Sequence, residues 1–182
     1  MDFERLRIPE VILFKPKIFS DERGFFFESF KSPVFQEVTG LNLHFLQDNH
    51  SQSMKGVLRG LHYQLPPFAQ GKLVRVTHGE VYDVAVDIRQ SSPTFGHYVG
   101  AKLSDKNHHQ LWIPPGFAHG FVTLSDRADF LYKTTNLYYP DAERSIRYDD
   151  PTLNITWHFD GTPLVASNDL SASSFLKADY FD

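Results

Sequence analysis

Apolar and polar residues alternate along the chain in short segments, most clearly over residues 80–88. Tyr82 and Val86 fall on one face of this segment, while Asp83 and Asp87 fall on the other. A period of two residues predicts a β-strand. Other short apolar or alternating runs predict further strands at residues 11–14, 24–30, 43–48, 56–64, 72–77, 97–103, 109–113, 119–124, 129–136 and 145–148.

A hairpin is expected between residues 72–78 and residues 80–88. His78 and Gly79 end the first run, and glycine supplies the positive φ that a tight turn requires. The 11 glycines and 11 prolines are spread along the chain and divide it into many short segments. Such a pattern is typical of an all-β protein.

Signals for helices are few. Residues 32–39 predict a short helix, with Ser32 as its N-cap and Pro33 at the first helical position. Residues 171–178 predict a second short helix, capped by Ser171.

Many short strands and few helices indicate a β-sandwich or a jelly-roll β-barrel. The length of 182 residues fits a single domain over residues 1–182. The edges of its sheets need protection, and pairing of terminal strands across a dimer is one way to provide it.

Composition excludes several classes of protein. With 18 Lys plus Arg against 22 Asp plus Glu, the net charge of −4 argues against nucleic acid or an anionic membrane as the main partner. The absence of cysteine excludes disulfides, thiolate metal sites and cysteine nucleophiles. No apolar run is long enough to span a bilayer, and the first residues contain no apolar signal region, so we expect a cytoplasmic protein.

Two histidine motifs are the first candidates for chemistry. Gly-Val-Leu-Arg-Gly-Leu-His-Tyr-Gln at 56–64 begins like the metal-binding pattern of cupin barrels, but Gln64 replaces the second His. Pro-Gly-Phe-Ala-His at 115–119 matches the second cupin motif. Two imidazoles without a thiolate are too few for a typical metal site, so no metal is expected. The alternative interpretation is that His62 and His119 are hydrogen-bonded core residues.

Two further segments are ambiguous by themselves. Arg23 and Glu28 lie in a polar turn that leads into a strand, and they would point apart unless Gly24 breaks the alternation. Tyr132 lies within a predicted strand, where packing is the commoner role of a tyrosine. The remaining histidines lie in polar or turn contexts and are predicted to be surface residues: His44, His50, His78, His97, His108, His109 and His158.

Taken together, the motifs resemble those of the dTDP-4-dehydrorhamnose 3,5-epimerases, which are cupin-fold enzymes acting on nucleotide sugars. The resemblance extends over nearly the whole chain and rests on six blocks in the family's order: residues 21–26, 47–51, 58–64, 71–76, 79–87 and 112–121. It implies a cupin-type jelly-roll barrel that forms a homodimer and uses neither metal nor cofactor.

The resemblance also implies individual roles. His62 matches the family's proton acceptor, Asp169 its carboxylate partner, and Tyr132 its proton donor, while Tyr138 lies where an aromatic ring contacts the thymine. Substrate-binding positions are matched by Arg23, Glu28, Gln47, Asn49, Arg59, Lys72, His119 and Glu143. Arg23 and Glu28 are expected to reach the site of the partner subunit. Asn168 departs from the family pattern, which commonly has Lys there.

These residue types suit the implied reaction. The hydrogens on C3 and C5 of a 4-keto sugar lie beside the ketone, so a base such as His62 can form an enolate. Asp83 is a local alternative to Asp169 as partner of that histidine. We expect Lys72 to stabilise the enolate oxygen, and Arg23 and Arg59 to bind the diphosphate.

One structural condition follows. Arg59 and His62 differ in parity along their strand, so both can face one cavity only if a bulge at Gly60 shifts the alternation.

Rival functions remain at this point. The same fold also hosts enzymes that epimerise only C3 or C5 and enzymes that are 3,4-ketoisomerases. A metal-dependent cupin oxygenase or isomerase is disfavoured by Gln64, and a barrel that only binds nucleotide sugars is a third class.

Overall fold

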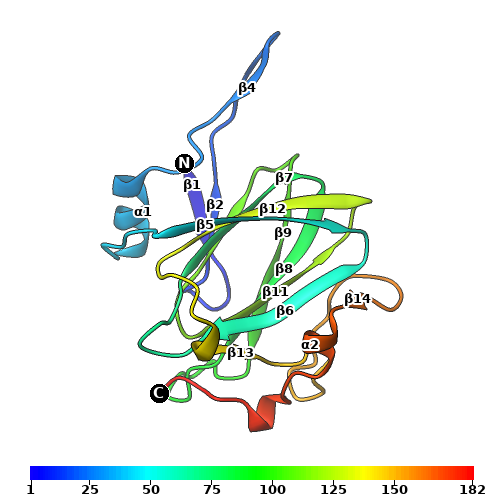
Figure 1. Cartoon of the computed structure of the whole chain (residues 1–182). Coiled ribbons are helices and arrows are strands. Elements are labelled where there is room, and N and C mark those ends of the chain that lie inside the picture. Colours follow the sequence, from blue (N-terminus) through cyan, green and yellow to red (C-terminus); the bar gives the residue numbers. More distant parts are fainter.

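The computed structural model describes residues 1–182 and contains two large sheets that face each other (Figure 1). The first sheet consists, in spatial order, of β1 (Asp2–Arg5), β2 (Ile12–Lys15), β10 (Gln110–Ile113), β7 (Lys72–His78), β12 (Arg127–Thr134) and β5 (Gln47–Met54). The second consists of β13 (Glu143–Ser145), β6 (Val57–Gln64), β11 (Phe117–Thr123), β8 (Glu80–Asp87) and β9 (Tyr98–Ser104), with β14 (Leu164–Val165) parallel to β6. This is the predicted all-β architecture.

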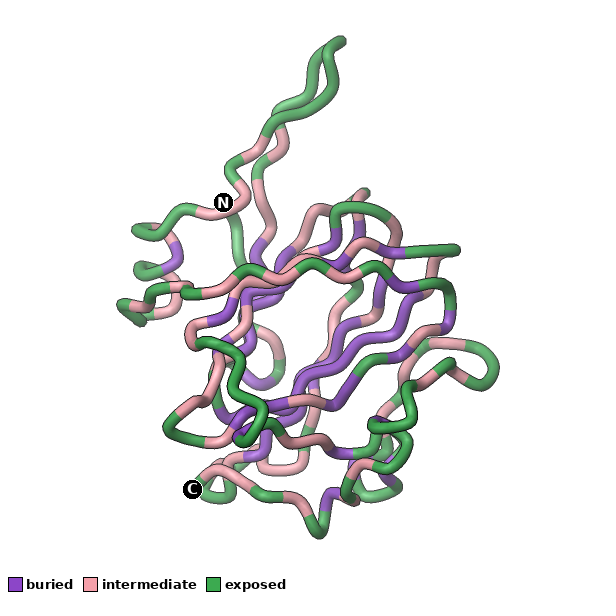
Figure 2. The backbone as a smooth tube through the Cα atoms, in the orientation of Figure 1, coloured by how far each residue is buried: buried purple, intermediate pink, exposed green.

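The main core fills the space between the two sheets. Phe121 of β11 and Phe130 of β12 stack with their ring centroids 4.1 Å apart, which ties one sheet to the other. Val74 of β7 and Ala85 of β8 are fully buried in the same cluster. Figure 2 shows the buried backbone concentrated in these central strands. Burial of each large apolar side chain stabilises the fold by about 1.5–3 kcal/mol.

The predicted hairpin between residues 72–78 and 80–88 is wrong, although both strands exist. Strand β7 pairs with β10 and β12, whereas β8 pairs with β11 and β9 in the other sheet. Gly79, at φ +79°, carries the chain from one sheet to the other, and an added Cβ would lie 2.0 Å from the carbonyl oxygen of Arg127. Alternation identifies a strand but not its neighbour.

The strand predicted at 43–48 is also misplaced, because the structure has β5 over Gln47–Met54. This strand reads Gln-Asp-Asn-His-Ser-Gln-Ser-Met and has only one fully buried residue, Ser53. A strand at the edge of a sheet needs few apolar residues, so its sequence gave no hydrophobic signal.

The first predicted helix is confirmed and the second is wrong. Helix α1 spans Ser32–Thr39, but Lys31 rather than Ser32 occupies the N-cap position. Residues 171–178 do not form one helix: α2 is Ser167–Leu170, and Phe175–Lys177 is a short 3₁₀ helix. A further 3₁₀ turn, Pro140–Ala142, precedes β13. None of these helices has the length and apolar content needed to cross a membrane.

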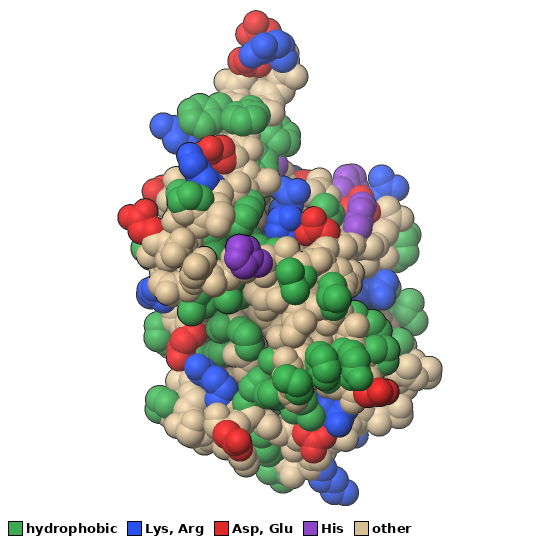
Figure 3. Space-filling view, turned by 60° about the vertical axis from the view of Figure 1, so that its left-hand side comes forward, with side chains coloured by type: hydrophobic (Ala, Val, Ile, Leu, Met, Phe, Trp, Pro, Cys, Tyr) green, Lys and Arg blue, Asp and Glu red, His purple; other side chains and the backbone are tan.

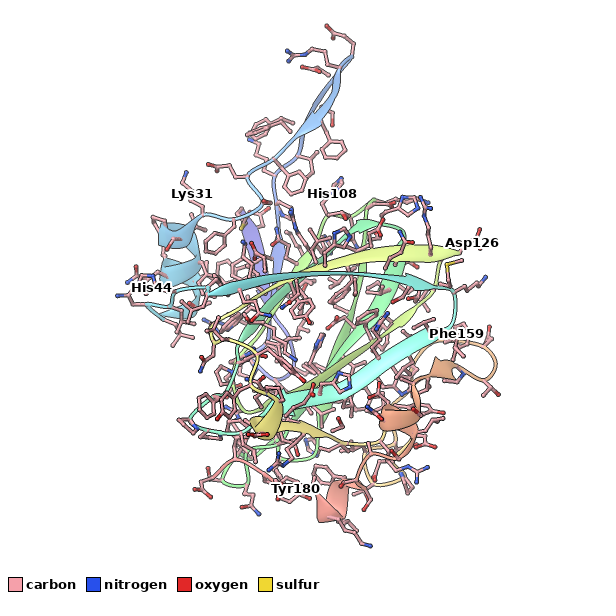
Figure 4. The ribbon with its side chains drawn as sticks, in the orientation of Figure 1. Lys31, His44, His108, Asp126, Phe159 and Tyr180 are labelled. Carbon is pink, nitrogen blue, oxygen red and sulfur yellow. The ribbon has the colours of Figure 1, made fainter.

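A two-stranded hairpin projects away from the barrel near the N-terminus. It is formed by β3 (Phe19–Asp21) and β4 (Gly24–Phe26), and every residue in these strands is exposed (Figures 1 and 2). We call residues 19–26 the arm. Figure 3 shows charged side chains at its tip and hydrophobic ones below them. The ring of Phe25 packs against that of His108, with centroids 4.7 Å apart. His108 lies on the barrel below the arm (Figure 4).

Candidate active site

A pocket of about 230 Å³ opens between the two sheets. Strands β5, β7 and β12 of the first sheet form one wall, and β6 with the segment around Pro140–Ala142 forms the other. Seven of the residues proposed from the sequence line it: Gln47, Asn49, His62, Lys72, Tyr132, Tyr138 and Glu143. Tyr63, Gln64 and Gln70 complete the lining, and the sequence had not proposed them as site residues.

His62, which lines this pocket, forms a hydrogen-bonded pair with Asp169. The Nε2 atom of His62 lies 2.7 Å from Oδ1 of Asp169, and Oδ2 of Asp169 accepts a bond of 3.1 Å from the Gly60 amide. Burial acts to raise the pKa of Asp169, but these two bonds, together with the charges of His62 and Arg59, hold the pKa below its ordinary value. The carboxylate therefore stays charged and fixes the orientation of the imidazole ring.

The predicted bulge at Gly60 is confirmed. His119 pairs with His62 across β11 and β6, but Phe121 pairs with Arg59, so the register shifts by one residue between the two pairs. Gly60 has φ +122°, and an added Cβ would lie 2.6 Å from the Cα atom of Gly120. Only glycine permits this conformation and this close approach of the two strands.

With the bulge at Gly60, Arg59 lies close enough to the His62 region for its charge to affect Tyr132 and Asp169. The Nε atom of Arg59 donates to the hydroxyl of Ser53 at 3.0 Å, and the positive charge acts to lower the pKa values of Tyr132 and Asp169. Arg59 itself is exposed and lies beside the pocket rather than in its lining.

Tyr132 approaches from the opposite sheet. It lies on β12 between Asn49 of β5 and Val74 of β7. Burial raises the pKa of Tyr132 above its ordinary value, with Glu143 acting in the same direction. The phenol is consequently protonated at neutral pH and can donate a proton.

Lys72 contributes a cation to the lining of the pocket. Its Nζ atom lies 3.4 Å from the carbonyl oxygen of His62. Burial lowers the pKa of Lys72 to about 8, while Asp83 and Glu143 act in the opposite direction. At pH 7 the amine is still mainly protonated, so it can stabilise a developing negative charge.

A second histidine–carboxylate pair lies behind the first. His119 Nε2 is 2.9 and 3.1 Å from the two carboxylate oxygens of Asp83, and both side chains are buried. The alternative assignment of Asp83 as partner of His62 is therefore wrong. Burial lowers the pKa of His119 and raises that of Asp83. His119 does not line the pocket itself.

The rim of the pocket carries an exposed aromatic ring. The Tyr138 hydroxyl donates to Oε2 of Glu143 at 2.8 Å, and its backbone N–H donates to Oε1 of Gln47 at 3.0 Å. Gln47 in turn donates to Asn49 at 2.9 Å. Tyr138 is 51% exposed, so its aromatic side chain is accessible to a flat ligand.

Arg23 and Glu28 do not reach the pocket of their own chain. Arg23 sits at the tip of the arm, where its guanidinium binds Asp21 and its side chain is 84% exposed. Glu28 pairs with Lys31 at 3.2 Å. Asn168 is exposed on α2 beside Asp169.

Most of the histidines predicted to be surface residues are exposed. Two of them, His108 and His109, are half-buried, and the others are exposed. His44 lies on the outside of the molecule near α1 (Figure 4).

A second pocket of about 240 Å³ shares Asn49 and Tyr132 with the first, but it contains neither of the histidine–carboxylate pairs. The pocket with His62 is therefore the candidate active site.

Comparison with known proteins identifies the family. The family model described as dTDP-4-dehydrorhamnose 3,5-epimerase matches residues 5–177. The chain belongs to this family. A dTDP-4-dehydrorhamnose 3,5-epimerase of Shigella flexneri is 58% identical over 181 residues, covering 100% of this chain and 99% of the relative.

Solved structures of relatives share the fold. A dTDP-6-deoxy-D-glucose-3,5-epimerase of Legionella pneumophila Philadelphia 1, solved in complex with dTDP-4-keto-L-rhamnose, is 50% identical, with a TM-score of 0.94 over 98% of this chain and 94% of that one. A 3′-monoepimerase of Streptomyces bikiniensis, in complex with dTDP-quinovose, is 32% identical, with a TM-score of 0.88 over 94% of this chain and 86% of that one. This chain thus shares the cupin-type jelly-roll barrel of the epimerase family. Because a monoepimerase has the same fold, the fold alone does not determine how many carbons are inverted.

Proposed function

We propose that this epimerase-family protein inverts C3 and C5 of dTDP-4-dehydro-6-deoxy-D-glucose and so produces dTDP-4-dehydro-L-rhamnose. The observation that carries the proposal is that a base and an acid from opposite sheets face one pocket. His62, paired with Asp169, lies on one side, and the protonated Tyr132 lies on the other.

His62 acts as the base. Its Nε2 atom is bonded to Asp169, which leaves Nδ1 as the nitrogen available to substrate. Removal of the proton from C3 or C5 sends the electron pair into the C4 carbonyl and forms an enolate. Asp169 stabilises the imidazolium that results, and Lys72 stabilises the enolate oxygen.

Tyr132 returns a proton to the other face of the sugar. Inversion requires delivery opposite to the face from which the proton was removed, and Tyr132 comes from the sheet that faces His62. Because burial raises its pKa, the phenol holds its proton until the enolate carbon accepts it. The same two groups serve both carbons if the sugar ring presents C3 and C5 in turn.

The nucleotide is bound towards the rim. We place the thymine against the exposed ring of Tyr138, and the diphosphate near Arg59, where two parallel N–H groups can contact phosphate oxygens. Gln47, Asn49 and Glu143, which line the pocket, are proposed as further binding residues. The sequence also proposed His119, but this residue is buried against Asp83 and does not line the pocket, so we propose that it supports the lining. No metal or cofactor takes part in the proposed steps.

A homodimer completes the site in this proposal. The arm exposes the apolar rings of Phe19, Phe25 and Phe26 and carries Arg23 beyond the barrel. Exposed rings on a projecting hairpin favour contact with a second copy, so we propose that Arg23 and Glu28 enter the partner's pocket. Sedimentation at micromolar concentration is expected to show a dimer, and a monomer would contradict this part.

A monoepimerase is the second candidate, because the Streptomyces bikiniensis enzyme shares the fold. The deciding experiment is incubation with dTDP-4-dehydro-6-deoxy-D-glucose in D₂O, followed by NMR of the product. Deuterium at both C3 and C5 with inversion at both supports the proposal. Inversion at only one carbon would make the protein a monoepimerase, migration of the ketone a ketoisomerase, and binding without exchange a non-catalytic barrel. A cytoplasmic location and a single domain over residues 1–182 stay predictions.

A further inference from the structure

The side-chain amide of Gln64 forms hydrogen bonds to the surrounding backbone through both its nitrogen and its oxygen. It lies at the end of β6 and is 4% exposed. Its Nε2 atom donates to the carbonyl oxygens of Phe68 at 2.7 Å and Leu137 at 3.2 Å, and its Oε1 atom accepts from the Tyr139 amide at 2.9 Å. A primary amide has two donor hydrogens, and both are engaged here.

These bonds hold the chain on both sides of Tyr138. Gln64 binds the backbone of the residues that precede and follow Tyr138. Oε1 of Gln47 accepts a hydrogen bond from the backbone N–H of Tyr138 itself. Phe68, the other partner of Gln64, stacks on Tyr139 with centroids 3.8 Å apart. Three consecutive residues of an otherwise exposed segment are thereby fixed to β6 and β5.

The side chain of Tyr138 depends on this backbone. Its ring is exposed, and its only side-chain hydrogen bond is to Glu143, which is also exposed. The backbone bonds from Gln64 and Gln47 therefore set the position from which the ring projects over the pocket.

We propose that Gln64 is a positioning residue that holds Tyr138 in place for stacking on the base of the nucleotide. The inference rests on the proposed function, because it takes the thymine to lie against Tyr138. It also gives a physical role to a glutamine that replaces a metal-ligand histidine in the cupin pattern. A ring that is already in place loses less freedom on binding than a ring on a loose segment.

The test is a double-mutant cycle with Gln64→Leu and Tyr138→Ala, measured by calorimetry with dTDP. Tyr138→Ala is expected to weaken dTDP binding by about tenfold or more, the usual loss when a base loses an aromatic partner. Gln64→Leu is expected to weaken it by a similar factor. The double variant is expected to bind like Tyr138→Ala alone, because Gln64 acts through that ring.

Further readouts separate positioning from general damage to the fold. Inorganic diphosphate is expected to bind equally well to Gln64→Leu and the wild type, since it has no base. In turnover, KM is expected to rise about tenfold while kcat stays within about twofold. The matched control is Gln52→Leu, because the Gln52 side chain bonds to Asp129 on the exposed part of β5 and lies outside the pocket. This control is expected to change neither constant.

If Gln64→Leu does not fold, Gln64→Glu supplies the test. In this buried position the acid is expected to stay protonated, so it keeps an acceptor for Tyr139 and one of the two donor hydrogens, and an intermediate loss of dTDP affinity is expected. The inference is overturned if Gln64→Leu binds dTDP as the wild type does, if diphosphate binding falls equally, or if the effects of the two substitutions add.

The outcomes also separate the inference from the proposed function. Normal epimerisation with an unchanged dTDP affinity in Tyr138→Ala would refute the base contact, and with it the role of Gln64, but not the reaction. Loss of affinity in Tyr138→Ala without loss in Gln64→Leu would refute the role of Gln64 alone.

Discussion

The barrel contains two histidine–carboxylate pairs, each formed through Nε2 of the histidine, in very different surroundings. The side chain of His62 is 34% exposed and bonds to Asp169, whereas that of His119 is 8% exposed and bonds to Asp83, which is fully buried. His62 on β6 and His119 on β11 lie directly opposite each other in the sheet. Only the first pair opens into the pocket.

The comparison shows that a bonded histidine and carboxylate are not sufficient evidence of catalysis. A base needs a free nitrogen that substrate can reach, and its carboxylate must stay charged. The pKa of Asp169 lies below its ordinary value, while burial raises that of Asp83. The first pair is suited to moving a proton, and the second to filling the core and supporting the wall behind the pocket.

Loss of the base should have the largest effect. His62→Ala is expected to lower turnover by about 10³–10⁴-fold and to abolish exchange of sugar hydrogens in D₂O, because a missing general base removes the first step. NMR of the nucleotide sugar measures both. His119→Asn is the comparison variant, and exchange is expected to remain detectable in it. Loss of exchange in both variants to the same extent would contradict the division of roles.

Loss of the acid should separate exchange from inversion. Tyr132→Phe keeps the ring but removes the proton donor, and we expect inversion to fall by about 10²–10³-fold while some exchange persists. The enolate still forms at His62 and collapses back to the same face. Inversion of C3 and C5 at a near wild-type rate in D₂O would show that Tyr132 only packs.

Loss of the carboxylate charge should have a smaller effect on turnover. Asp169→Asn keeps the shape of the side chain but cannot balance an imidazolium, so kcat is expected to fall by about 10²-fold. A rate within twofold of the wild type would mean that Asp169 does not support the base.

The same variant should change the response to acid. Because the folded pKa of Asp169 is lowered, its contribution to stability is complete above its unfolded value of about 3.9 and is lost as pH falls through the folded value. Below about pH 4, the unfolding free energy of wild type should therefore fall more steeply than that of Asp169→Asn. Denaturant titration over this range checks the sign.

Asp83→Asn should show the opposite balance. We expect an unfolding free energy lower by about 1–3 kcal/mol, because a buried pair loses its charged partner, and a decrease in kcat of less than about tenfold. Thermal melting and steady-state kinetics on Asp83→Asn and Asp169→Asn together give the contrast. A larger kinetic loss in Asp83→Asn would assign the catalytic role to the buried pair.

Removal of metal ions should have no effect on activity. Where a metal-binding cupin has its second histidine, this chain has Gln64, whose amide is engaged by the backbone of Phe68, Leu137 and Tyr139. Protein treated with a chelator is expected to keep its full activity. Loss of activity that a divalent cation restores would place a metal beside His62 and change the meaning of both pairs.

The sequence predicted the strands better than their pairing. The alternation around Val84 correctly identified β8, but it could not show that β7 lies in the other sheet, because pairing depends on contacts distant in the chain. The edge strand β5 was misplaced because its residues are almost all polar. The bulge at Gly60 was predictable, since parity required it if Arg59 and His62 were to share a cavity.

The site was predictable only in part, and for a physical reason. Asp169 lies 107 residues from His62, and no spacing rule connects them, so its role came from the family resemblance. Asp83 was the local alternative because it lies on a recognisable strand face, yet it bonds to His119. The bonds of Gln64 to a segment about 75 residues away could be found only in the folded chain.

The arm has a genetic consequence if it completes the partner's pocket. A chain altered at Arg23 still has an intact His62, and a chain altered at His62 still has an intact Arg23. When both chains are produced in one cell, some dimers contain one chain of each kind. In each such dimer, one of the two sites combines an unaltered His62 from one chain with an unaltered Arg23 from the other. Two alleles that are each inactive alone should therefore complement each other, whereas two alleles altered in the same pocket should not.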